Sequence, residues 1–447
     1  MTASNEPPSA DVPDSPLSPV ARVVTSFGLV VASALALVLL VSTSWNPIQN
    51  TPSASHDLIG APEFGSTETV PLTDFYDAPT PLPDMNPGSL MKTEPISGAP
   101  EGVKATRYMY LSTNIAGEPI PVTGALFESA SGTPAAPRPL IGFAHGTTGL
   151  ARICGVSQAP FTSGTTGAEF WGPEIKPLVD SGYVVAATDY QNMGAPGTPS
   201  YLVAQSEAYA VLDSMRAAVN LAPGRIDISK MALTGHSQGG QASLAAAQYS
   251  AEYAPELAIR GAVSQSTGMV VGLPLVAKQV AAGSDDPVGD SKKSEYVAFL
   301  VESWAKSYPD VIDPTEIMTP DGMEALPLTQ ELCGVPLREK FADKPLSAYV
   351  KSDLPSSFLR VANLNVPTGY VPFPVLITQG DEDESVVPEF TYATFRALCQ
   401  TGTEADLQIY PDDDHNSILW TAQTPVLDWL AARLDQQQVP NGCVGRQ

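Results

Sequence analysis

Short apolar runs alternate with longer amphipathic stretches over most of the chain beyond residue 138. Residues 206–221 repeat apolar side chains at the 3.6-residue period of a helix packed on a core. Strands are predicted at 139–144, 183–188, 230–234, 259–263, 374–378 and 405–410, and further helices at 240–247 and 418–434. Strands that alternate with helices predict a mostly parallel sheet with both faces covered.

A hairpin is predicted just before this alternation. Residues 107–111 and 120–127 are rich in aromatic and β-branched side chains and flank the turn-forming residues 114–117. A second break in the pattern spans residues 268–370, where prolines separate helical patches at 295–304 and 337–341. An insertion of this size predicts a mainly helical cap over the sheet, or a structural elaboration unrelated to substrate access.

The N-terminal hundred residues divide into three parts. Residues 1–21 are polar and proline-rich and predict a disordered N-terminus. The next segment, 22–45, contains nineteen successive uncharged residues (23–41). This length lies between that of the apolar part of a signal peptide and that of a membrane-spanning helix. An uncleaved membrane anchor is slightly favoured over a cleaved signal peptide, and a helix buried in the core is the alternative. Residues 46–100 form a proline-rich lead-in, and a catalytic domain is expected over 101–447.

Charge and cysteine content narrow the class of protein. The chain has 48 Asp and Glu against 23 Lys and Arg, which excludes a basic nucleic-acid interface. The four cysteines, Cys154, Cys333, Cys399 and Cys443, contain no C-x-x-C pair, so no metal site is expected. An even count in an exported chain predicts two disulfides with three possible connectivities, whereas four buried thiols are the alternative. The chain is therefore expected outside the cytoplasm, secreted or anchored, and as a monomer.

Gly235-His236-Ser237-Gln238-Gly239 stands between a predicted strand and a predicted helix. A strand, a tight glycine turn and a helix form the nucleophile elbow of an α/β-hydrolase, in which glycines leave room around an exposed serine. The predicted fold class is therefore an α/β-hydrolase with an inserted helical cap. Ser237 is the candidate nucleophile.

A catalytic serine needs a base within hydrogen-bond reach, and in this fold the order along the chain is Ser, acid, His. The chain has four histidines, of which only His415 follows Ser237; His56, His145 and His236 precede it, and the His236 side chain is expected to point away from the nucleophile. The acid is expected after strand 374–378, with Asp383 preferred over Asp381.

Two backbone N–H groups are expected to hold the oxyanion of the acyl transition state. One belongs to Gln238, which follows the nucleophile, and the other to Thr147, or else Thr148, in the turn after strand 139–144. Carboxylates crowd the loops at 381–384 and 412–414, which disfavours anionic substrates and favours a neutral ester or lipid.

The chain resembles the secretory lipase family of the lipase A type from about residue 74 to its end. The resemblance is carried by Phe75-Tyr76, Pro87-Gly88-Ser89-Leu90, Val122-Thr123-Gly124, His145-Gly146-Thr147-Thr148-Gly149 followed by Cys154, Thr188-Asp189-Tyr190, residues 210–218, Gly235 to Gly240 and the loop 380–388 before His415. It implies a cap inserted before the penultimate strand, ester hydrolysis without a cofactor, and Cys154–Cys333 and Cys399–Cys443 pairing. Asp383 lies five residues before Pro388, one more than the family pattern, so an insertion could shift the acid.

The sequence thus predicts an exported serine hydrolase that cleaves carboxylic esters, a lipase or carboxylesterase, through an acyl-enzyme on Ser237. Two alternatives stay open. The same triad could serve an acyltransferase acting on envelope lipids or sugars, and the fold could be an inactive hydrolase-like binding module.

Overall fold

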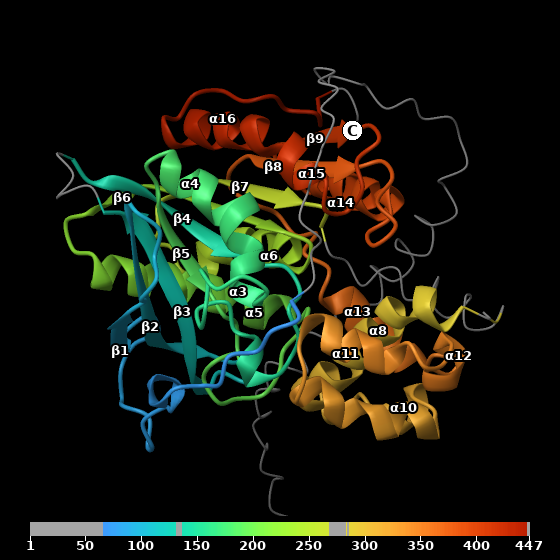
Figure 1. The fold of residues 1–447 in the computed structure, drawn as a ribbon. Coiled ribbons are helices and arrows are strands. Elements are labelled where there is room, and N and C mark those ends of the chain that lie inside the picture. Colours follow the sequence, from blue (N-terminus) through green and yellow to red (C-terminus); the bar gives the residue numbers. More distant parts are fainter. Residues whose placement is uncertain (1–65, 131–135, 268–282, 284–285, 445–447) are drawn as a thin grey trace, which may run out of the picture. The chain divides into compact units, whose positions relative to one another are not determined.

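A nine-stranded sheet organises the part of the chain that the computed structural model describes, residues 66–130, 136–267, 283 and 286–444 (Figure 1). The strand order is β1-β2-β3-β5-β4-β6-β7-β8-β9. The bounds are β1 Leu90–Pro95, β2 Val103–Thr113, β3 Pro119–Ser129, β4 Arg138–Ala144, β5 Val184–Thr188, β6 Ile226–His236, β7 Ile259–Gln265, β8 Val375–Gly380 and β9 Ala405–Tyr410. β1, β2, β3 and β5 pair antiparallel, whereas β5, β4, β6, β7, β8 and β9 run parallel, so the predicted α/β-hydrolase class is confirmed.

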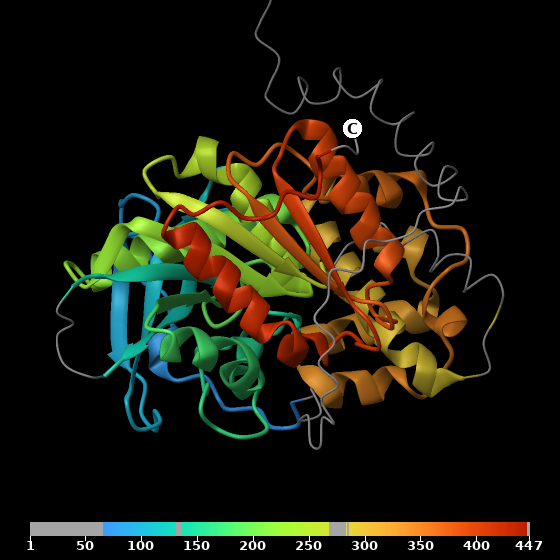
Figure 2. The ribbon, with the colours of Figure 1, turned by 90° about the horizontal axis from the view of Figure 1, so that it is seen from above.

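Helices cover both faces of the sheet, because successive strand residues point to opposite sides (Figure 2). Leu140 and Ala144 of β4 join one hydrophobic core, and Ile141 and Phe143 join the other. The first face is covered by α5 (Ala204–Leu221), α6 (Gln238–Tyr253) and α14 (Pro388–Thr401). The second is covered by α3 (Thr166–Phe170), η3 (Trp171–Ile175), α4 (Lys176–Asp180), α15 (Ile418–Thr421) and α16 (Gln423–Leu434).

The insertion between β7 and β8 is helical, as predicted, and we call its described part, residues 286–371, the cap. Its elements are α8 (Pro287–Ser307), α9 (Pro314–Ile317), α10 (Pro320–Ala325), η5 (Leu326–Gln330), α11 (Gly334–Phe341), α12 (Leu346–Tyr349) and α13 (Ser356–Leu364). The cap has a hydrophobic cluster of its own around Trp304, Phe341 and Phe358. That cluster also takes in Tyr201 from the sheet domain, whose carbonyl accepts a hydrogen bond of 3.2 Å from Trp304 Nε1.

Two predicted elements differ in the structure. The lead-in 46–100 includes the short helix η1 (Asp74–Tyr76) and the edge strand β1, which is half exposed and too short to show an alternating pattern. The closing helix predicted at 418–434 is two helices that meet at Ala422. Pro425 has no backbone N–H for the carbonyl of Thr421, which accounts for the break. The hairpin is confirmed, with Thr113 opposite Pro119.

The predicted disordered N-terminus, 1–21, and the predicted signal or anchor segment, 22–45, lie outside the described residues. Most of the stretch 268–285, where the predicted cap begins, also lies outside them. Within the described ranges, no helix combines the length and the apolarity that crossing a bilayer requires.

Candidate active site

The turn between β6 and α6 holds Ser237 in a strained backbone conformation, with φ 59° and ψ −121°. A positive φ is costly for a residue with a side chain, and such strain persists where the surroundings enforce it. Here they do: a Cβ on Gly239 would lie 1.9 Å from the carbonyl oxygen of Ala144, and one on Gly235 would lie 2.4 Å from the same atom. Both glycines are therefore required for β4, β6 and α6 to meet closely enough to form the elbow.

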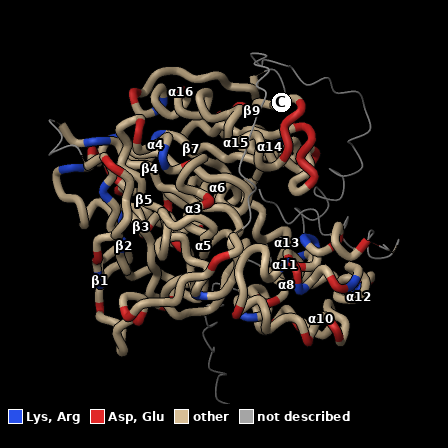
Figure 3. The backbone as a smooth tube through the Cα atoms, in the orientation of Figure 1, with Lys and Arg blue, Asp and Glu red and all other residues tan. Residues whose placement is uncertain are grey.

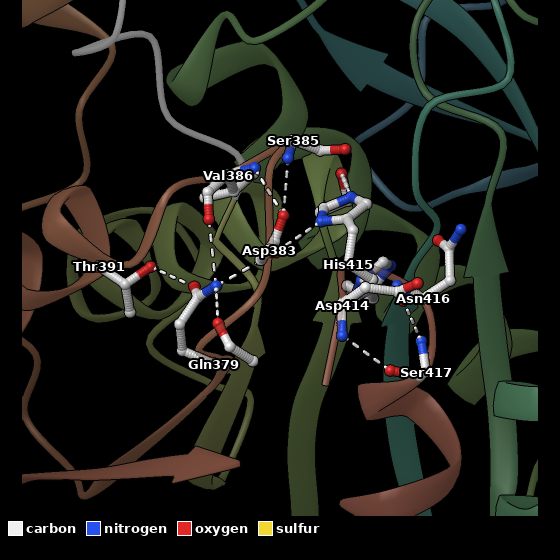
Figure 4. A network of polar contacts seen from close by, with 12 residues as sticks. Gln379, Asp383, Ser385, Val386, Thr391, Asp414, His415, Asn416 and Ser417 are labelled. Atoms are coloured by element: carbon white, nitrogen blue, oxygen red, sulfur yellow. Dashed lines mark hydrogen bonds and ion pairs between the residues drawn. The ribbon is translucent and has the colours of Figure 1, made fainter. Parts of the chain in front are cut away.

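A chain of hydrogen bonds runs from Ser237 through His415 to Asp383. Ser237 Oγ lies 2.9 Å from His415 Nε2, and His415 Nδ1 lies 2.8 Å from Asp383 Oδ2 (Figure 4). Because the carboxylate can only accept, Nδ1 carries the proton and Nε2 is left to accept from the serine hydroxyl. Asp383 and His415 are buried, whereas Ser237 keeps partial exposure among the described residues.

Asp383, and not Asp381, is the carboxylate on His415. Asp383 also accepts from the backbone N–H groups of Ser385 and Val386, at 2.9 and 2.8 Å, and from Gln379 Nε2 at 3.1 Å. Burial alone would raise the pKa of this carboxyl, but the His415 contact and the Val386 N–H outweigh it and lower the pKa to about 2. Asp381 is exposed and accepts instead from the Asp412 N–H, at 2.8 Å. The longer spacing to Pro388 thus has not moved Asp383 away from His415.

Gln379 was absent from the sequence predictions and holds the acid loop together. Besides Asp383, its Nε2 donates to the carbonyls of Gly380 and Val386, and its Oε1 accepts from Thr391 Oγ1 at 2.6 Å (Figure 4). A glutamine at the end of a strand carries no local signal for this role, because the contacts depend on how the loop 381–387 folds back.

The two acidic loops predicted from the sequence lie side by side at the ends of β8 and β9 (Figure 3). The Glu382 N–H donates to the Asp413 carbonyl at 3.0 Å, and the Asp381 N–H donates to the Tyr410 carbonyl at 3.1 Å. In the described part of the chain, no group of histidine, cysteine or acidic side chains has a geometry suited to a metal ion.

The two residues predicted to hold the oxyanion follow the carboxyl ends of β4 and β6, which are neighbouring parallel strands. Gln238 is the first residue of α6, where backbone N–H groups have no partner within the helix, and Thr147 is in the turn after β4. Their side chains are held in place: Thr147 Oγ1 lies 2.9 Å from the hydroxyl of Tyr201, and Gln238 Nε2 donates to Glu207 Oε1 at 2.7 Å.

Glu207 is a buried carboxyl that the sequence did not single out. It lies on α5, and its Oε1 also accepts from the Leu202 N–H at 2.9 Å, while its Oε2 has no partner in the structure. Burial raises the pKa of Glu207 to about 8, against the lowering effect of its two hydrogen bonds. The side chain lines a small pocket together with Gln238, Tyr190 and Tyr201. A neutral carboxyl therefore lies next to the proposed oxyanion residue.

Neither of the other two described histidines hydrogen-bonds to the Ser237 side chain. His145 is buried, and its Nδ1 donates to the Gly146 carbonyl at 2.6 Å; burial lowers its pKa to about 4. The expectation that the His236 side chain points away from the nucleophile stays a prediction; its Nε2 donates to the backbone carbonyl of His415 at 2.6 Å. Since 179 positions separate these two histidines, the sequence offered no sign of the contact. His56 lies outside the described residues.

Both disulfides implied by the family resemblance are present. Cys154–Cys333 joins the loop after β4 to the start of α11 in the cap, and Cys399–Cys443 joins α14 to the C-terminal segment. The alternative of four buried thiols is thereby excluded.

The strand order, the strained elbow and the position of the site at the carboxyl ends of β6, β8 and β9 define an α/β-hydrolase. Comparison with known proteins narrows the class further. The sequence profile of the secretory lipase family matches residues 157–442, and the chain belongs to this family.

Individual relatives are distant. A secreted triacylglycerol lipase of Malassezia furfur, LIP4, is 25% identical over 59% of this chain, and the match spans only half of that relative's length. Lipase 10 of Candida albicans is 23% identical over 84% of this chain and 83% of its own. A probable inactive lipase of Mycobacterium tuberculosis is 29% identical over 42% of this chain and 44% of its own.

Solved structures agree on the fold. The X-ray structure of lipase A from Candida antarctica superposes with a TM-score of 0.68 and covers 84% of this chain and 89% of its own, at 18% identity. At that identity the likeness concerns the fold alone.

Proposed function

We propose that the protein is an exported serine hydrolase that cleaves neutral carboxylic esters through an acyl-enzyme on Ser237. The observation that carries this proposal is the continuous contact from Ser237 Oγ through His415 to Asp383, at 2.9 and 2.8 Å, beside a strained elbow. Membership of the secretory lipase family and two disulfides, which form in oxidising compartments, support it.

In the acylation step, Ser237 Oγ attacks the ester carbonyl while His415 Nε2 takes the hydroxyl proton. The new imidazolium stays paired with Asp383, which is ionised at any pH well above 2. The backbone N–H groups of Gln238 and Thr147 are the proposed donors to the oxyanion. His415 then returns the proton to the departing alcohol, and the acyl group remains on Ser237.

Deacylation repeats these roles with water. His415 takes a proton from the attacking water, and the acid product leaves as Ser237 recovers its proton. No cofactor is needed for either step, because the serine, the histidine and two N–H donors supply the nucleophile, the proton carrier and the charge stabilisation.

The test is hydrolysis of p-nitrophenyl esters of increasing acyl length, together with labelling by a fluorophosphonate probe. Wild type is expected to hydrolyse at least one ester and to be labelled, and Ser237→Ala is expected to lose both. An unlabelled wild type would favour a binding module instead. This alternative is retained because one of the relatives is named as a probable inactive lipase. Transfer of the acyl group to an added alcohol in preference to water would favour an acyltransferase.

A further inference from the structure

We propose that His236 is a positioning residue that fixes His415 relative to Ser237 by donating a hydrogen bond to the His415 backbone carbonyl. This inference rests on the proposed function, since it concerns how the proton carrier of that reaction is held. Its basis is the 2.6 Å contact between His236 Nε2 and His415 O and the packing of the two imidazole rings, whose centroids lie 4.6 Å apart.

The hydrogen bond from His236 to His415 connects two parts of the site, because His236 is the neighbour of Ser237 along the chain. His236 is the last residue of β6 and directly precedes Ser237, so its backbone moves with the nucleophile elbow. His415 comes from a loop between β9 and α15, on the far side of β7 and β8 in the strand order. The hydrogen bond therefore joins the loop that carries the base directly to the turn that carries the nucleophile.

The His415 loop has few other constraints at the histidine itself. Asp414 Oδ1 accepts from the N–H groups of Asn416 and Ser417, at 2.8 and 2.7 Å, which shapes the turn after His415 (Figure 4). The Asp383 contact orients the ring, and the bond from the Glu382 N–H to the Asp413 carbonyl ties this loop to the acid loop. Neither contact directly sets the distance between the His415 backbone and the elbow. The bond from His236 supplies that distance, and thereby the 2.9 Å separation between His415 Nε2 and Ser237 Oγ.

The chemistry of a buried neutral imidazole suits this role. A carbonyl oxygen only accepts, so the contact fixes the proton of His236 on Nε2. Burial, followed by the charge of His415, lowers the pKa of His236 to about 3. His236 therefore stays uncharged while His415 becomes an imidazolium during turnover, and the two rings do not repel each other.

The experiment compares His236→Phe, which keeps an aromatic ring and removes the donor, with His236→Gln, whose amide can donate from a similar position. Both are made in the wild type and in His415→Ala, and kcat, KM, the rate of fluorophosphonate labelling and the thermal midpoint are measured. His236→Phe is expected to lower kcat and labelling about 100-fold with little change in KM, because misplacement of a catalytic group by about 1 Å costs that much. His236→Gln is expected to recover most of the loss.

The His415→Ala background separates positioning from a general structural role. If His236 acts through His415, His236→Phe changes nothing further there. The inference is overturned if wild type is active and His236→Phe stays within about twofold of it, or if the same loss recurs without His415.

The outcome is distinguishable from a failure of the proposed function. A wild type that neither hydrolyses esters nor is labelled would refute the hydrolase proposal, and the far-downfield proton resonance of His415 Nδ1–H would then be compared between wild type and His236→Phe. A shifted or broadened signal with an unchanged thermal midpoint would still support positioning, and an unchanged signal would overturn it.

Discussion

The sheet domain and the cap build the candidate site in different ways. The sheet domain supplies every group of the proposed reaction and carries them at strand ends, in a glycine turn and in the loops that follow β8 and β9. The cap supplies three contacts to segments that flank the site. Cys333 is disulfide-bonded to Cys154, Trp304 donates to the carbonyl of Tyr201, and Lys292 donates to Ser385 in the acid loop. Changes to the reacting groups of the sheet domain should abolish ester hydrolysis, and changes to the cap contacts should only lower its rate.

The largest effect is expected at the acid. Asp383→Asn leaves the size of the side chain unchanged but removes the charge that fixes the His415 tautomer, and it should lower kcat about 10⁴-fold. Asp381→Asn is the matched control, two residues away in the same loop and exposed, and should stay within a few-fold of wild type. Steady-state ester hydrolysis checks both. A larger loss for Asp381→Asn would move the acid to Asp381.

The sheet domain was largely predictable because its signals are local. The period of apolar residues gave the strands, and Gly235 and Gly239 marked the elbow whose close approach to Ala144 only glycine allows. The order of residues along the chain left His415 as the one base that could follow Ser237. By contrast, Glu207, His236 and Lys292 make contacts with residues 31, 179 and 93 positions away, which nothing in their sequence neighbourhoods records. The contacts of Gln379 are nearer in sequence, but they depend on how the loop 381–387 folds back. In the cap, only the helical stretches 295–304 and 337–341 were predicted. Short helices separated by prolines are too brief to show the 3.6-residue repeat of apolar side chains.

The two disulfides give the next test, because one joins the two regions and the other does not. Cys154–Cys333 spans 179 positions and Cys399–Cys443 spans 44. On the chain-entropy estimate, replacing each pair by serines costs about 5 and about 4 kcal/mol of stability, respectively. Only loss of Cys154–Cys333 should also reduce activity, because it removes the covalent link between the loop after β4 and the cap.

Thermal unfolding and ester hydrolysis of the Cys154→Ser/Cys333→Ser and Cys399→Ser/Cys443→Ser proteins separate the two effects. Equal loss of specific activity in both variants, measured well below their unfolding temperatures, would contradict a particular role for the link between the regions.

A smaller, pH-dependent effect is expected at Glu207 in the sheet domain. Its pKa is raised from 4.5 to about 8, so between these values the unfolded chain has released a proton that the folded protein keeps, and stability falls as pH rises. Glu207→Gln removes this dependence while keeping an oxygen for the Leu202 N–H and Gln238 Nε2. Relative to wild type, the free energy of unfolding of Glu207→Gln should therefore be higher at pH 8 than at pH 5, by on the order of a few kcal/mol. Thermal midpoints across this range provide the measurement, with the exposed Glu252→Gln on α6 as the control.

The smallest effect is expected where the cap contacts the acid loop. Lys292 of α8 donates from Nζ to Ser385 Oγ at 2.5 Å, and the Ser385 N–H donates to Asp383 Oδ1 at 2.9 Å. Lys292→Met keeps the aliphatic stem and removes this support, while the Val386 and Gln379 bonds to Asp383 remain. We therefore expect kcat/KM to fall only about three- to tenfold, as for the loss of one hydrogen bond of about 1 kcal/mol.

Lys293→Met is the matched control for this contact, because the neighbouring lysine is more exposed and lies 3.9 Å from Asp290, within its own helix. If both lysine variants reduce kcat/KM equally, the effect comes from the lost positive charge near an acidic site and not from the contact with Ser385. If Lys292→Met alone does so, and adds nothing in an Asp383→Asn background, the cap acts on the reaction through the acid loop. In that case Lys292 couples the cap to the acid loop, in addition to the link that Cys154–Cys333 makes between the two regions.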